Sequence, residues 1–236
     1  MIDAINVALS SQLALERRLA TLADNVANSG TAGYRATSVR FEEVREAGTS
    51  FVSRGVSFAS TAHGAVEETG GAFDMALRGE GWFAIGTAGG PSVTRDGRFL
   101  LDPQGTLVTS TGEPVLDAGG APVQLAPGGG PATVAGDGSI SQGGQVVSAV
   151  GIFRYEPGPN PERTGTSAIR VRGALEPVTD DARVGVMQGF VERSNVDPVR
   201  EMTRLIAIHR DFDNVAAAVR DAEGATEAMI RTLGEG

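Results

Sequence analysis

Residues that could carry out chemistry are few in this chain of 236 residues. It has two histidines, His63 and His209, and no cysteine, which excludes disulfides, thiolate metal sites and cysteine nucleophiles. His63 stands alone in "STAHGAV", and His209 falls on an apolar helical stripe, so we expect both to be structural. The signatures of zinc proteases, serine hydrolases, P-loop proteins and zinc deaminases are all missing. The sequence therefore predicts no catalytic residue, no metal site and no cofactor.

Two glycine-rich stretches are superficially similar to binding loops. In "GEGWFAIG" at 79–86 the glycines precede an apolar, strand-like run, whereas a phosphate loop needs a helix N-terminus there. "AGDGSISQGG" at 135–144 is similar to one repeat of a calcium-binding β-roll, and a single copy cannot build such a roll. We expect a turn entering a strand at the first site and a β-turn at the second.

Composition limits the remaining function classes. The formal net charge of -9 argues against a nucleic-acid-binding protein, which needs a basic surface. The chain has 33 glycines, 11 prolines and only 5% aromatic residues, a balance that favours turn-rich β-structure. No apolar run approaches the length of a membrane span, so we expect no membrane insertion. The opening "MIDAINVALSSQLALERRLATL" lacks the features of a cleavable signal peptide.

Long helices are predicted at both ends of the chain, because apolar residues recur there in steps of three and four. In residues 3–28 the main stripe consists of Ile5, Ala8, Gln12, Leu15, Leu19, Leu22 and Val26, and a second stripe of Ile2, Leu9 and Leu13. In residues 198–233 the stripe consists of Met202, Leu205, His209, Phe212, Ala216, Val219, Thr226, Ile230 and Leu233. Asp197 and Pro198 mark the start of the second helix as a side-chain cap and a first-turn proline.

The middle of the chain alternates short strand-like runs with turn signals. Asp96-Gly97 is a signal for a two-residue hairpin of type I′, and "DPQG" at 102–105 is a signal for a β-turn. We expect a meander of short antiparallel strands that closes into a small barrel-like or sandwich domain. The predicted divisions are residues 1–35 (helix and turn), 36–69 (extended connector), 70–175 (β-rich domain), 176–196 (return connector) and 197–236 (helix).

These elements predict an α+β fold in which the terminal helices pair in a coiled-coil-like, discontinuous domain, with the β-rich domain inserted between them. A helix pair leaves the second N-terminal stripe uncovered, so we expect other subunits to cover it. The predicted assembly interface consists of Ile5, Leu9, Leu15, Leu19, Leu22, Val26, Met202, Leu205, Phe212, Val219, Ile230 and Leu233.

Four blocks of the chain, in order, resemble the bacterial flagellar axial proteins, the basal-body rod and hook family. They are "ADNVANSGTAGYR" at 23–35, "FDMALRGEGWFAI" at 73–85, "TRDGRFLLDPQGTLVTSTGEPVL" at 94–116 and "VERSNVDPVREM" at 191–202. The motif residues that match are Asn25, Ala27, Asn28, Thr31, Gly33, Tyr34, Arg35, Ser194, Asn195, Val196, Asp197, Arg210 and Phe212. Asp24 and Asp213 depart from the asparagine and glutamate that are usual in the family. The opening residues resemble the proximal rod type more than the distal rod type, which remains the alternative.

The resemblance implies a structural subunit of the rod, the drive shaft that crosses the periplasm, and no enzymatic activity. It implies other rod subunits and further copies as partners, and export through the flagellar type III apparatus without signal cleavage. It also implies termini that order on assembly, with the β-rich domain on the outside of the tube.

Two hypotheses from other classes remain open on the residues alone. One is a secreted β-rich protein that cleaves or binds carbohydrate, since 29 acidic residues leave room for a catalytic carboxylate pair. The other is a coiled-coil scaffolding adaptor that forms a closed oligomer. Rapid hydrogen exchange at both termini of the monomer would favour the rod subunit over either.

Overall fold

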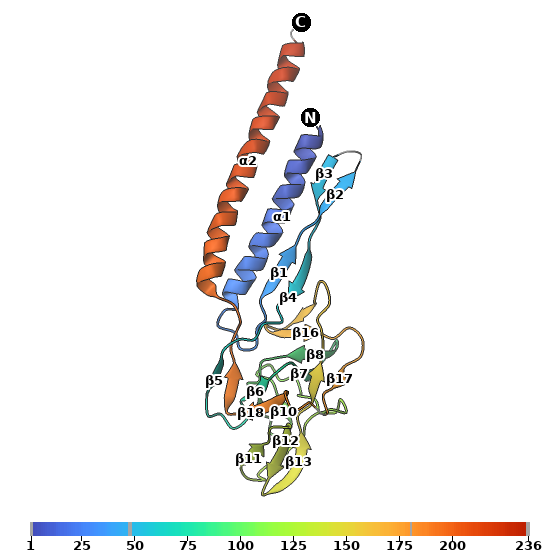
Figure 1. The fold of residues 1–236 in the computed structure, drawn as a ribbon, viewed down its shortest axis with the longest axis vertical. Coiled ribbons are helices and arrows are strands. Elements are labelled where there is room, and N and C mark those ends of the chain that lie inside the picture. Colours follow the sequence, from blue (N-terminus) through green and yellow to red (C-terminus); the bar gives the residue numbers. More distant parts are fainter. Residues whose placement is uncertain (1, 47–48, 180, 235–236) are drawn as a thin grey trace. The chain divides into compact units, whose positions relative to one another are not determined.

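Two long helices and a strand-rich middle make up the fold in the computed structural model (Figure 1), which gives the predicted α+β class. The structure describes residues 2–46, 49–179 and 181–234, with their side chains except at 2–5, 46, 221–223 and 225–234. The chain divides into two units. We call residues 1–27, 37–58 and 197–236 the helical unit, and residues 28–36 and 59–196 the β-rich unit.

The helices have nearly the predicted bounds. Helix α1 (Ile2–Ala27) contains no glycine or proline and ends where "NSG" follows. Helix α2 (Pro198–Gly234) begins with the predicted cap, because the backbone N–H of Arg200 donates to Oδ1 of Asp197 at 3.1 Å. The two helices lie side by side and run antiparallel within the helical unit (Figure 1).

Short strands complete the helical unit. They are β1 (Thr37–Arg40) with β4 (Val56–Ala59), and β2 (Glu43–Glu46) with β3 (Thr49–Val52). Strand β3 lies against α1, where the N–H of Val52 donates to Oγ of Ser10 at 3.2 Å. Much of the segment expected as a connector therefore belongs to the same unit as the helices.

The β-rich unit holds the remaining strands, which pair antiparallel. They are β5 (Val66–Glu68), β6 (Met75–Arg78), β7 (Trp82–Thr87), β8 (Gly90–Thr94), β9 (Leu100–Leu101), β10 (Leu107–Val108), β11 (Ala132–Val134), β12 (Ser139–Gln142), β13 (Gln145–Ala149), β14 (Ile152–Arg154), β15 (Arg163–Thr164), β16 (Ala168–Arg170), β17 (Glu176–Pro177), β18 (Gly185–Gln188) and β19 (Phe190–Glu192). The largest sheet has the order β15-β16-β8-β7-β14-β17. Since β15 and β17 are its edges, the predicted barrel closure is not confirmed for the described strands.

The core of the β-rich unit is apolar and closely packed. Met75, Phe83, Leu107, Val115 and Ile140 are fully buried in one cluster. The ring of Phe83 also meets the ring of Phe99 edge-on, with centroids 5.1 Å apart. Each such side chain stabilises the fold by about 1.5–3 kcal/mol relative to its exposed state.

The predicted turns have mixed outcomes. "DPQG" is confirmed as a turn between β9 and β10, with the N–H of Gly105 donating to the carbonyl of Asp102 at 3.0 Å. The turns before β7 and β12 are also confirmed. The type I′ hairpin at Asp96-Gly97 is wrong, because neither residue has a positive φ. A two-residue hairpin with both φ values positive joins β12 and β13 instead, at Gly143-Gly144.

Candidate functional site: helix faces and a buried charge cluster

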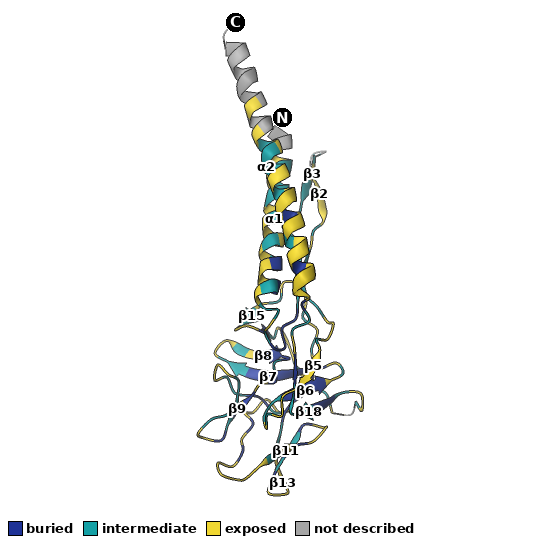
Figure 2. Cartoon of the chain, turned by 90° about the vertical axis from the view of Figure 1, so that its left-hand side faces the viewer, coloured by how far each residue is buried: buried dark blue, intermediate teal, exposed yellow. Residues whose placement is uncertain are grey.

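Helix α1 has one side turned toward the rest of the helical unit and one side exposed (Figure 2). Of the predicted interface residues, Leu22 is buried, and Leu15, Leu19 and Val26 are half-buried. Leu9 and Leu13 lie on the exposed side, with 52% and 58% of their surfaces accessible. Ile5 lies outside the described side chains.

Helix α2 is rotated relative to the predicted stripe. Leu205, Phe212 and Val219 are half-buried as expected, but the buried positions on the same side are Glu201 and Ile208. Met202 and His209 stand one residue further along the chain and are exposed, so they lie outside the row that packs within the helical unit. At the first turn of α2 the residue that this row buries is a glutamate, Glu201, which apolar spacing does not select. Ile230 and Leu233 lie outside the described side chains.

Asn25 explains why Glu201 is buried. Its side-chain amide donates to the carboxylate of Glu201 at 3.1 Å and to the carbonyl of Thr37 at 2.9 Å. Its Oδ1 accepts from the N–H of Thr37 at 2.8 Å. Arg204 donates to the other oxygen of Glu201 at 2.7 Å. One amide therefore fixes the end of α1 to β1 and to the first turn of α2.

The exposed surface of each helix includes a short row of large apolar side chains among polar ones. On α1 the row consists of Leu9 and Leu13, and on α2 it consists of Val199, Met202 and Ile206. These residues recur at steps of three and four, so each set forms a continuous row on its helix. No residue that the structure describes covers these rows, which makes them candidates for contact with another molecule.

The motif after α1 makes a compact turn in the β-rich unit. Asn28 accepts from Thr31 through both its carbonyl and its side-chain Oδ1. Gly33 is the residue with left-handed φ (65°), and a Cβ there would lie 2.0 Å from the backbone of Asp96. Tyr34 is 1% exposed and lies under the guanidinium of Arg163, so it anchors this turn in the β-rich unit. Asn28 and Gly30, which also stand close to the end of α1, do not adopt the left-handed conformation.

A buried charge cluster joins three motif blocks within the β-rich unit. The carboxylate of Glu192 contacts Arg35 at 2.9 Å and Arg95 at 3.1 Å, and each of the three side chains is no more than 2% exposed. The carboxylate also accepts from the N–H of Gly64 at 3.0 Å, and the backbone carbonyl of Glu192 accepts from Gly33 at 2.8 Å. We call Arg35, Arg95 and Glu192 the charge cluster. Sequence analysis singled out Arg35 as a motif residue and missed its two partners.

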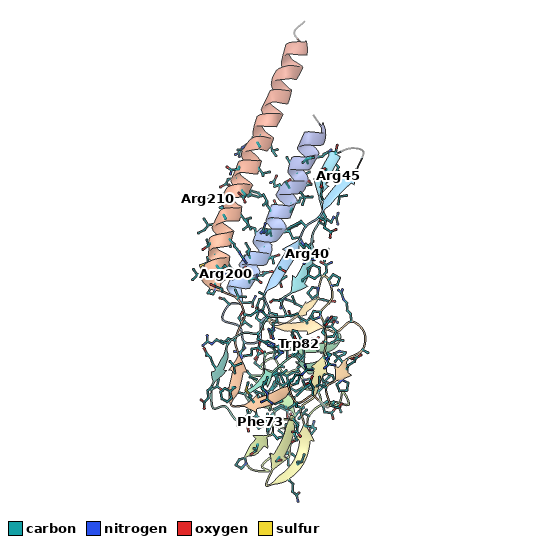
Figure 3. All side chains as sticks on the ribbon, viewed as in Figure 1. Arg40, Arg45, Phe73, Trp82, Arg200 and Arg210 are labelled. Atoms are coloured by element: carbon teal, nitrogen blue, oxygen red, sulfur yellow. The ribbon has the colours of Figure 1, made fainter. Side chains whose placement is uncertain are left out.

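Burial shapes the electrostatics of the charge cluster. Desolvation lowers the pKa of Arg95 to about 10, with Glu192 acting in the opposite direction, so the guanidinium stays charged at neutral pH. The indole of Trp82 lies within 5.7 Å of Arg35 and 5.9 Å of Arg95, and it is inside the β-rich unit (Figure 3). The two arginines that pair with Glu192 thus both lie over the single tryptophan of the chain.

Asn195 makes a second set of ties next to the charge cluster. Its Oδ1 accepts from the N–H of Ala36 at 2.7 Å, and its amide donates to Oγ of Ser60 and the carbonyl of Ala62. The backbone N–H of Asn195 donates to the carbonyl of Tyr34 at 3.3 Å. The neighbouring motif residues have simpler roles: Ser194 accepts from the N–H of Val196, Val196 is buried, and Asp197 caps α2.

The described residues offer little for chemistry on a substrate. They contain no group of three or more histidine, aspartate and glutamate side chains placed to hold a metal ion. His63 borders a recess of about 300 Å³ beside Arg35, Trp82 and Arg95. Burial and the two arginines lower the pKa of His63, which disfavours its protonated form. Among the described helices, none combines the length and the apolar character that a bilayer crossing requires.

Comparison with known proteins identifies the family to which these motif blocks belong. Three family models match: "Flagella basal body rod protein" at 5–35, "Flagellar hook protein FlgE/F/G D1 domain" at 76–149 and "Flagellar basal body rod FlgEFG protein C-terminal" at 187–232. The chain belongs to this family of flagellar rod and hook proteins, which are structural proteins and not enzymes. The predicted resemblance is therefore confirmed.

Individual relatives refine the assignment within the family. The chain is 50% identical to "Flagellar basal-body rod protein FlgF" of Mesorhizobium japonicum, over 99% of each chain. It is 50% identical to the protein of the same name from Rhizobium meliloti, over 97% of this chain and 96% of the relative. The Caulobacter vibrioides protein of that name is 37% identical over 100% of this chain and 99% of the relative. These full-length similarities confirm that the chain is most like the proximal rod type.

Proposed function

We propose that this chain is a structural subunit of the proximal rod of the flagellar basal body, and that it polymerises through α1 and α2 with copies of itself and other rod subunits. The observation that carries this proposal is the pair of uncovered apolar rows, Leu9 and Leu13 on α1 and Val199, Met202 and Ile206 on α2. Full-length similarity to basal-body rod proteins supports it.

Energetics favour assembly over a solitary helix pair. Among the described side chains of the helical unit, only Leu22, Asn25, Glu201 and Ile208 are buried. Two of these four are polar and add little hydrophobic stabilisation. Covering each exposed leucine, isoleucine or methionine in a rod would add about 1.5–3 kcal/mol. Contact with neighbouring subunits is therefore the main stabilising contribution still open to this unit.

The proposed assembly domain combines residues 1–27 with 197–236, and its helices pair in a coiled-coil-like manner; residues 28–35, which were predicted with it, belong to the β-rich unit. The half-buried and buried residues of α1 and α2 form the seam inside one subunit. The exposed rows, with Leu9 and Met202 from the predicted interface, form the contacts between subunits. Ile5, Ile230 and Leu233 extend the interface toward the ends of the helices.

Export through the flagellar type III apparatus fits the same features. A helical unit with so few buried groups is easily unfolded, because few contacts must be broken. Once outside the cell membrane, the helices gain stability by packing in the rod. The subunit then acts as part of the drive shaft for motility and has no catalytic task.

The test is incorporation into rods in cells that lack their own copy of the gene. Leu13→Asp and Ile206→Asp should abolish motility and remove the subunit from purified basal bodies, because each places a charge in a proposed contact. Leu13→Met is the matched control, since it keeps an apolar side chain of similar volume at the same site. Normal incorporation of both aspartate variants at wild-type cellular levels would refute the proposal.

Hydrogen exchange on the purified chain gives an independent check. Amides of α1 and α2 should exchange rapidly, and those of β6, β7 and β8 slowly, because the helical unit has few buried groups of its own. Uniform protection from one end to the other would favour a protein that is complete without partners.

A further inference from the structure

We infer that the charge cluster and Asn195 together act as a clamp, which fixes the two chain segments adjoining the helices to one another inside the β-rich unit and so prepares the helices for assembly. These segments are residues 28–36, which follow α1, and residues 192–196, which precede α2. The inference rests on the proposed function and assigns positioning residues to it.

Glu192 is the centre of the clamp, since four groups from three separate segments of the β-rich unit contact it. Arg35 and Gly33 belong to the segment after α1, Gly64 to the loop before β5, and Arg95 to the turn after β8. Arg95 is anchored in turn by the carbonyl of Gly79, to which it donates at 2.7 Å. The two helix-adjoining segments are thus bound to the sheet by the same carboxylate.

Asn195 repeats the connection three residues later. It receives the N–H of Ala36 and donates to Ala62 at 2.7 Å, so it joins the segments before α2 and after α1 to the 60–65 loop. Only Val196 and Asp197 separate Asn195 from the first residue of α2, and Ala36 is followed directly by Thr37 of the helical unit. The clamp therefore holds residues 28–36 and residues 192–196 together near the ends of the two segments in which the chain leaves the β-rich unit.

The chemistry of the clamp indicates positioning more than stability. A buried ion pair loses much of its Coulomb attraction to desolvation, and apolar residues of similar volume often stabilise a fold at least as well. Charged hydrogen bonds are directional and fix their partners in one geometry, which apolar contacts do not. Desolvation of Arg95 shows that this cost is present here.

The test compares clamp variants with a core variant in the full-length chain. Glu192→Gln and the milder Asn195→Ala remove clamp contacts, whereas Val123→Ala removes apolar packing from the core cluster that contains Phe83. Trp82 fluorescence gives the melting temperature of the β-rich unit for each variant. Hydrogen exchange at Gly33, Ala36 and Gly64 and incorporation into basal bodies are then measured.

We expect the clamp variants to raise exchange at these amides about tenfold and to lower incorporation about tenfold. Val123→Ala should incorporate normally at an equal or larger loss of melting temperature. The inference is overturned if incorporation follows melting temperature in all variants alike, or if Asn195→Ala changes neither exchange nor incorporation. If Glu192→Gln fails to fold, exchange and incorporation of Asn195→Ala alone test the inference.

The same experiment separates this inference from the proposed function. If Leu13→Asp loses incorporation while Glu192→Gln and Asn195→Ala incorporate normally, the clamp inference is wrong and the proposed function stands. If Leu13→Asp and Ile206→Asp also incorporate normally, the proposed function is wrong, and the clamp inference, which rests on it, is wrong with it.

Discussion

The two units of this subunit bury their own surfaces to very different degrees. In the β-rich unit, Met75, Phe83, Leu107, Val115 and Ile140 are completely inaccessible to solvent and form one core. In the helical unit, Leu22 and Ile208 are the buried apolar residues among the described side chains, while leucines on α1 remain more than half exposed. The β-rich unit buries its apolar core with its own residues. The helical unit leaves apolar side chains exposed, which partners could cover.

This difference shows how a polymerising protein can divide its tasks. A self-sufficient unit keeps its shape whether or not the polymer exists, so it can hold other parts in place. A unit that is stabilised mainly by neighbours gains its full stability only where those neighbours are present. The helical unit is therefore less stable wherever neighbouring subunits are absent. This disfavours assembly away from the rod without a separate regulatory element.

The strongest test of the comparison is Phe83→Ala in the β-rich unit. Removing a fully buried ring that contacts Phe99 should cost about 3–5 kcal/mol, through lost burial and the cavity left behind. Thermal unfolding followed by Trp82 fluorescence measures the loss. Leu100→Ala, at a side chain 56% exposed, is the control and should change the stability by less than about 0.5 kcal/mol. Equal losses for the two variants would mean that the core is not where the structure places it.

A smaller effect is expected from Asn25→Leu in the helical unit. The substitution leaves the buried carboxylate of Glu201 and the backbone of Thr37 short of partners, at a cost of about 1–3 kcal/mol. Helix ellipticity should therefore melt at a lower temperature, while the Trp82 transition stays in place. Asn6→Leu, the same substitution at an exposed position of α1, is the control. A matching shift of the Trp82 transition would contradict the separation of the two units.

The smallest predicted effect concerns pH and His63. Burial, Arg95 and Arg35 lower the pKa of His63 from 6.5, so the unfolded chain binds this proton more readily than the folded one. The stability of the β-rich unit should thus fall as pH drops below about 6.5, and His63→Gln should flatten this dependence between pH 7.5 and 5.5. His209→Gln in the helical unit is the control for removing a histidine. An unchanged slope in His63→Gln would show that other groups cause the pH dependence.

The sequence predicted those elements whose signals are local. Helix α1 and the start of α2 followed from apolar spacing and from Asp197-Pro198, and the β9–β10 turn followed from "DPQG". The failure at Asp96-Gly97 has a tertiary cause. Gly97 packs so closely on the carbonyl of Met75 that a Cβ would lie 1.7 Å from it, and this approach determines the local backbone instead of a hairpin.

The site was predicted less completely, because its contacts join distant parts of the chain. Glu201 is charged, so periodicity placed it outside, yet its partner Asn25 stands 176 residues earlier. Arg95 and Glu192 are 97 residues apart, and no local spacing connects them. The available signal was membership of the motif blocks: Asn25, Arg35, Arg95 and Glu192 all fall within the four stretches that resemble the family.

These long-range polar pairs restrict how the protein can be recombined. The first block of the chain depends on the last, through Asn25 with Glu201 and Arg35 with Glu192. In a hybrid whose N-terminal third comes from a relative, that relative supplies one partner of each pair. The other partner, Glu201 or Glu192, comes from this chain. Exchange of parts between rod proteins should succeed when both ends are transplanted together, as a matched set.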